Sequence, residues 1–97
     1  MIEQSGDSLR VTVPMLIVNA SALLEAGRKC LQAAAPAGET TFDLSAVEEA
    51  DSSALTVIFA WLRTARERGA TLHIAHPPAS MISLAELYGV SDFLPLA

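Results

Sequence analysis

The sequence predicts one α/β domain, with a mostly parallel central sheet of about four strands and three to four helices. Strand-like and helix-like segments alternate along the chain, an order typical of parallel strands joined by crossover helices. The chain has 97 residues, enough for a single hydrophobic core, so we expect one domain over residues 1–97. Apolar residues make up 52% of the chain, which favours a packed fold over disorder.

Each element follows from a local pattern. Alternating apolar and polar residues predict strands, and apolar residues at helical spacing predict helices. Pro36 and Gly38 end the first helix, which Asn19 or Ser21 caps, and Gly69 fits the end of the longest helix. The predicted strands cover 9–13, 15–18 (a short edge strand), 40–44 and 71–75, and the predicted helices cover 20–34, 52–68 and 79–88.

Charge and composition exclude several classes of function. The formal net charge is −5, which disfavours binding to nucleic acid or directly to anionic lipid. The longest apolar runs are too short to span a bilayer, and the first residues lack the features of a signal peptide. We therefore expect a cytoplasmic protein that reaches the membrane only through a partner. Cys30 has no second cysteine to pair with, and its position indicates a small buried side chain.

The start of the longest predicted helix is the main candidate site. A strand ends in Phe42-Asp43-Leu44-Ser45, a loop follows, and Asp51-Ser52-Ser53 opens the helix. Helix N-termini have unpaired N–H groups and a partial positive charge, so they stabilise anions and hydroxyls. One of these three residues caps the helix, which leaves a second hydroxyl available. A phosphate on Ser53 would gain from the helix dipole but would be repelled by the neighbouring acidic residues.

No pattern for catalysis or metal binding accompanies this site. Glu48 and Glu49 are adjacent and need not converge on a cation, so we interpret them as part of a solvated acidic loop. His73 and His76 have no Cys, Asp or Glu at metal-ligand spacing. The sequence also lacks the G-x-S-x-G signature of a nucleophile elbow. We therefore expect a non-enzymatic protein without metal or cofactor.

The longest helix has two contrasting faces on a helical wheel centred on Leu55. The face expected to pack on the sheet comprises Leu55, Ile58, Phe59 and Leu62. The opposite face is small, apolar and aromatic where a solvated face would be charged, and it comprises Ser53, Val57, Ala60, Trp61 and Thr64. Small residues around a tryptophan are typical of a protein interface, so we interpret this face, together with Ser52 and the adjacent predicted helix over 79–88, as a partner-binding surface. The alternative is that Trp61 packs on a neighbouring helix of its own domain, and the sequence leaves both open.

In order and spacing these motifs resemble the STAS family (sulfate transporter and anti-sigma factor antagonist domains). The resemblance covers nearly the whole chain and is strongest from 41 to 90. It depends on Asp43-Leu44-Ser45, on Asp51-Ser52-Ser53 before a leucine-rich helix, on Arg66-Glu67-Arg68-Gly69, and on Leu84-Ala85-Glu86-Leu87-Tyr88-Gly89. It implies an α/β fold, a non-enzymatic binding role, and a functional site at the N-terminus of the long helix.

Within this family the chain is most similar to the MlaB-like branch. These are small cytoplasmic STAS subunits of the ABC transporters that traffic phospholipids and maintain outer-membrane lipid asymmetry. The resemblance implies that the chain binds and regulates the cytoplasmic ATPase, with Ser52 at the contact. The alternative is an anti-sigma factor antagonist, in which a partner kinase would phosphorylate Ser53. The chain has Ala54 where those antagonists usually have Gly, which favours the transporter reading.

Overall fold

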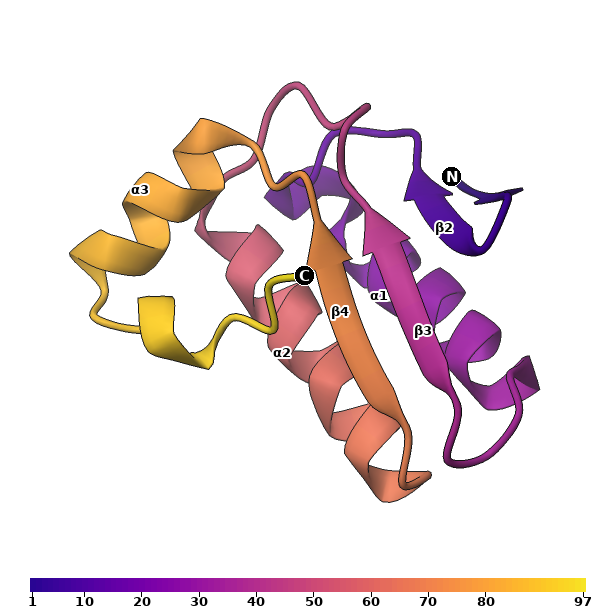
Figure 1. Ribbon diagram of the computed structural model, residues 1–97. Coiled ribbons are helices and arrows are strands. Elements are labelled where there is room, and N and C mark those ends of the chain that lie inside the picture. Colours follow the sequence, from indigo (N-terminus) through magenta and orange to yellow (C-terminus); the bar gives the residue numbers. More distant parts are fainter.

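Four strands in the order β1-β2-β3-β4 form one sheet in the computed structural model, which describes residues 1–97 (Figure 1). β1 pairs antiparallel with β2, whereas β2, β3 and β4 run parallel. The expected α/β fold with a mostly parallel sheet of four strands is confirmed. The strands are β1 (Ile2–Ser5), β2 (Ser8–Val11), β3 (Glu39–Asp43) and β4 (Thr71–Ala75), and the helices are α1 (Ile17–Ala33), α2 (Ser52–Glu67), α3 (Ala79–Leu87) and the short 3-10 helix η1 (Ser91–Phe93).

The helices cover one face of the sheet. α1 and α2 lie side by side against that face, while α3 and η1 lie next to α2 beyond the β4 edge (Figure 1). Phe42 and Ile74 point from the strands into this layer and are fully buried. The core therefore lies between the sheet and the α1–α2 pair. None of the helices has the length and apolar character needed to cross a membrane.

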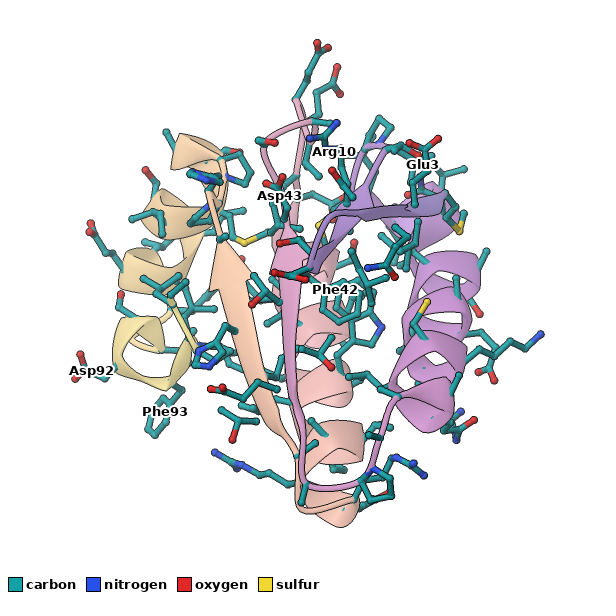
Figure 2. All side chains as sticks on the ribbon, turned by 45° about the vertical axis from the view of Figure 1, so that its right-hand side comes forward. Glu3, Arg10, Phe42, Asp43, Asp92 and Phe93 are labelled. Atoms are coloured by element: carbon teal, nitrogen blue, oxygen red, sulfur yellow. The ribbon has the colours of Figure 1, made fainter.

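The opposite face of the sheet is polar. Alternation along the strands puts Thr41 and Asp43 on this face, next to residues of β2 and β4 in the parallel register. Arg10 and Asp43 lie together on this face (Figure 2), with Arg10 Nε 3.6 Å from Asp43 Oδ2. His73 Nε2 lies 3.1 Å from Glu39 Oε1. Both pairs are partly exposed to water, so they make this face polar but contribute little to the stability of the fold.

The strand predicted over 9–13 is present as β2 (Ser8–Val11), but the residues on either side of it differ from the prediction. Residues 2–5 form the edge strand β1, which the sequence did not indicate because its Ile-Glu-Gln-Ser pattern has only one apolar residue. Gly6, at φ +60°, makes the turn into β2. The predicted edge strand over 15–18 was wrong: Met15 forms only an isolated bridge to Ala50, and the α1 helix already begins at Ile17.

α1 begins three residues before its predicted start because side chains satisfy its first N–H groups. Asn19 was one of the two predicted capping residues, and it lies inside the helix. Its Oδ1 accepts a hydrogen bond from the Leu16 N–H at 3.1 Å, and its Nδ2 donates to the Pro14 carbonyl at 2.7 Å. The N–H of Ile17 donates to the carboxylate of Asp51, which is 34 positions further along the chain.

Candidate functional site

A single carboxylate, that of Asp51, joins the N-termini of α1 and α2. Its Oδ1 accepts the Ser53 N–H at 2.9 Å, so Asp51 is the residue that caps α2. Its Oδ2 accepts the Ile17 N–H, also at 2.9 Å. The first turns of the two helices therefore share one acceptor, and Ile17 is fixed beside the start of α2.

The same contacts alter the acidity of Asp51. A hydrogen bond from the Ser53 hydroxyl, followed by the bond from the Ile17 N–H, lowers the pKa of Asp51 below its ordinary value of 3.8. The carboxylate is therefore charged at neutral pH and compensates the partial positive charge of both helix ends. An additional anion at this place would meet that negative charge.

The two predicted site serines have different environments. Ser52 is exposed and is the first residue of α2. Ser53 is half-buried, and its hydroxyl donates a hydrogen bond to Asp51. Ser52 is therefore the hydroxyl free to contact a partner, whereas Ser53 would have to leave Asp51 before it could be modified.

The prediction that Trp61 belongs to an exposed docking patch was wrong. The indole is fully buried and stacks on Phe42, with ring centroids 4.3 Å apart and planes inclined by 16°. Its Nε1 donates to the Leu24 carbonyl of α1 at 3.0 Å. Gly27 of α1 leaves the space that the ring occupies, because a Cβ at that position would lie 2.1 Å from Trp61 Cε2. The alternative reading, packing on a neighbouring helix of the same domain, is the one that the structure has.

The rest of the predicted patch is also turned toward α1. Val57 is 1% exposed and Thr64 is 8% exposed, and the Thr64 hydroxyl donates to the Ala60 carbonyl at 3.2 Å. Ala60 is only half-buried, but it faces the same α1 side, where it lines a small depression with Leu24. Three predicted contact residues, Val57, Trp61 and Thr64, are therefore core residues and are unavailable to a partner.

The error has a simple geometric cause. The buried stripe of α2 runs along Ala54, Ile58, Trp61 and Ala65, each at most 1% exposed. Its centre lies about a quarter turn from Leu55, on which the wheel was centred. α2 packs against both the sheet and α1, so the face toward α1 is buried as well. Phe59 and Leu62, which the wheel placed against the sheet, are instead half-buried on the α3 side.

An open groove runs along that side of α2, between α2 and the α3–η1 segment. We call it the α2–α3 groove. Two adjoining depressions form it, and they share Phe59 and Val90. The end near the helix N-terminus is lined by Ile17, Ser52, Ser53, Leu55, Thr56 and Tyr88, and the other end by Leu62, Arg63, Arg66 and Phe93.

Exposed apolar side chains surround the groove. Ile17 is 75% exposed, Tyr88 is 56% exposed, and Phe93 is 66% exposed and projects from η1 (Figure 2). Apolar groups left uncovered around a concave surface are typical of a protein-binding site. Of the six predicted contact residues only Ser52 and Ser53 lie here, and Tyr88 belongs to the 79–88 helix that was also expected at the docking surface. Ile17, Val90 and Phe93 were not predicted here, and the aromatic Phe93, outside any predicted element, was the available signal.

The acidic residues of the chain do not gather into a metal site. No three His, Cys, Asp or Glu side chains come together in the structure. Glu48 and Glu49 are exposed in the loop before α2. Asp43 binds the Ser45 N–H at 2.9 Å, and this bond is the main cause that lowers the pKa of Asp43.

Comparison with known proteins identifies this arrangement. Residues 2–96 match the family model described as "Mlab, STAS domain". A comparison with curated proteins gives no significant match. Among solved structures, a candidate anti-sigma factor antagonist from Thermotoga maritima superposes with a TM-score of 0.76 at 18% identity, covering 99% of this chain and 83% of the other.

Two further structures share the fold. An anti-sigma-factor antagonist (STAS) domain protein from Planctomyces limnophilus gives a TM-score of 0.75 at 12% identity, over 99% of this chain and 86% of that one. A sulfate transporter family protein from Wolinella succinogenes gives 0.65 at 12% identity, over 88% of this chain and 67% of that one. At such low identity these likenesses establish the fold alone.

Proposed function

The chain belongs to the STAS domain family, and on that premise we propose that it is a non-enzymatic protein-interaction subunit that docks through the α2–α3 groove. Its partner is the cytoplasmic ATPase of an ABC transporter that traffics phospholipids and maintains outer-membrane lipid asymmetry. The match to the MlaB-type family model over residues 2–96 supports this choice of partner. The chain would stabilise or regulate the ATPase and would sit at the inner membrane through it.

The proposed docking surface rests mainly on the position of the exposed apolar side chains. Three large apolar side chains stay exposed around the groove that begins at Ser52, namely Ile17, Tyr88 and Phe93. Other apolar residues fill the core, so these three are not needed to complete it. Exposed aromatic groups beside small hydroxyl residues suit an interface, because the aromatics supply contact area and the small residues permit close approach. This surface replaces the Trp61 patch as the docking face.

Binding to the ATPase tests the proposal. The full chain is titrated against the purified ATPase subunit of the phospholipid transporter from the same genome, and the dissociation constant is measured by calorimetry. Thr56→Arg puts a long charged side chain into the groove and is expected to weaken binding at least about tenfold. Thr71→Arg, the same change at an exposed position of β4, is the matched control and is expected to bind within about twofold of the unchanged chain.

Two results would count against the proposal. No binding by the unchanged chain would refute the choice of partner. Equal affinity of both arginine variants would show that the ATPase is bound by another face.

A second function rests on the position of one serine. Ser53 lies in the first turn of α2, where a phosphate would meet the positive end of the helix, although its hydroxyl would first have to leave Asp51. In that case the chain would be an anti-sigma factor antagonist, and its partner would be an anti-sigma kinase. Incubation with the candidate kinase and ATP, followed by intact-mass measurement, separates the two: one added phosphate mapped to Ser53 supports the switch, and an unchanged mass supports the transporter subunit.

A further inference from the structure

The α2–α3 groove changes chemistry along its length. Near Ser52 its lining is uncharged and mixes apolar side chains with hydroxyls, whereas its far end is lined by Arg63 and Arg66 beside Phe93. Ser52 and Arg66 are 14 positions apart on one helix, so the groove is about 20 Å long. That length matches about four turns of a helix.

Three of the six lysine and arginine side chains lack a polar partner: Lys29 on α1, and Arg63 and Arg66, the two that line the groove. Arg10 and Arg28 form ion pairs with carboxylates, and Arg68 donates to the Ala34 carbonyl. Neither Arg63 nor Arg66 forms an ion pair or a side-chain hydrogen bond, even though Glu67 is one helical turn from Arg63. Two free positive charges therefore lie at one end of an apolar groove, in a protein whose formal net charge is −5.

From this complementarity we propose that the groove binds an acidic amphipathic helix of about four turns from a protein partner. Apolar side chains on one face of that helix would pack on Phe59, Val90 and Phe93, and Asp or Glu residues near one of its ends would pair with Arg63 and Arg66. This inference rests on the proposed function for the location of the surface, and it adds the chemistry of the segment that binds there.

Charge gives such a site its selectivity. Bidentate pairing between a guanidinium and a carboxylate fixes the register of the bound helix, and a basic helix would meet two uncompensated positive charges. The apolar contacts supply most of the affinity, because exposed ion pairs contribute little. A single-chain lipid would be held poorly, since the groove is open to solvent along its length rather than closed around a chain.

A peptide pair tests the inference independently of any ATPase. One probe is a 15-residue amphipathic helix with leucines at helical spacing and glutamates on its polar face, and its matched counterpart has lysine in place of every glutamate. Each is titrated into the isotope-labelled full chain, and amide chemical shifts are followed. We expect the acidic peptide alone to shift the signals of Phe59, Val90 and Phe93.

Charge reversal then locates the contact. Arg66→Glu is expected to weaken binding of the acidic peptide at least about fivefold, while Lys29→Glu, the same charge change at an exposed position of α1, changes it less than about twofold. Arg66 is an exposed residue near the end of α2, so we expect its replacement to leave the fold intact, and the spectrum of the free variant checks this.

Several outcomes would overturn the inference. Equal chemical-shift changes with both peptides would mean that the groove does not distinguish an acidic helix from a basic one. Shifts elsewhere on the chain, or none, would exclude the groove as a helix site. Shifts of the groove signals with dodecanoate or anionic vesicles but not with peptide would assign the groove to lipid, and concentration-dependent shifts without any probe would assign it to a second copy of the chain. The ATPase titration is separate, so its failure would refute the partner and leave the peptide result standing.

Discussion

Trp61 shows how one residue can determine both packing and the location of the functional surface. An exposed tryptophan would have been the centre of an interface, but here the indole fills the space between Phe42 and Gly27. Its N–H is satisfied by the Leu24 carbonyl, so burial leaves no polar group unpaired. Replacing Trp61 with Ala would remove a buried aromatic side chain and cost about 3–5 kcal/mol, so loss of partner binding in that variant would report unfolding.

Gly27→Ala tests this packing directly. Alanine in place of glycine within a helix normally stabilises by about 1 kcal/mol. Here the new Cβ would lie 2.1 Å from Trp61 Cε2, so the clash outweighs the helix preference. We expect a net loss of about 1–3 kcal/mol in the free energy of unfolding, measured by urea denaturation.

A second substitution serves as the control. Combining Gly27→Ala with Trp61→Phe removes the part of the indole that the Cβ would meet, so the two costs are expected to be less than additive. A Gly27→Ala variant at least as stable as the unchanged chain would contradict the packing described for Trp61.

At the scale of the elements, Asp51 holds two helices together. Its pKa is lowered by the Ser53 hydroxyl and by the Ile17 N–H, so the folded state favours the charged carboxylate. The stabilisation is therefore complete above the ordinary value of 3.8 and is lost as the pH falls below it toward the lowered pKa.

The pH dependence of stability measures that coupling. We expect the unchanged chain to be more stable than Asp51→Asn at pH 7, since an asparagine can cap α2 but cannot accept from both helices as a charged group. The difference between the two free energies of unfolding should shrink below about pH 4, when Asp51 becomes protonated. A difference that stays constant down to pH 2.5 would show that Asp51 does not act through its charge. Subtracting the variant removes the contribution of Asp43, whose pKa is also lowered.

The sequence predicts some elements better than others, and the reason is the range of the interactions that define them. β4 matches its predicted bounds, because alternation is a local pattern. β1 has a single apolar residue and is a strand only because β2 pairs with it. Residues 15–18 read as a strand by composition, but long-range capping by Asp51 begins a helix at Ile17.

The faces of α2 could not be assigned from the helix alone. A wheel locates apolar residues but does not tell which apolar stripe meets the sheet, which meets α1 and which stays uncovered. The informative signal was outside α2. Gly27 lies inside the predicted helix over 20–34, and a glycine within a helix indicates that a large side chain packs closely against it. The start of the site at Asp51-Ser52-Ser53 was predictable, since capping is local; the groove was not, because Tyr88, Val90 and Phe93 reach it only through the tertiary fold.

For the whole molecule, the two faces divide the possible roles. The open face of the sheet is polar and includes paired charges, whereas the side of α2 away from α1 is apolar and bordered by two unpaired arginines. A protein that docks through the second surface leaves the first one facing water.

Hydrogen–deuterium exchange of the full chain, free and bound to the transporter ATPase, tests this division most directly. We expect slower exchange in the first turns of α2 and in residues 87–93 of the bound chain, with no change in the β1–β2 hairpin. Protection confined to the β1–β2 hairpin and the open face of the sheet, with the α2–α3 groove unaffected, would contradict it.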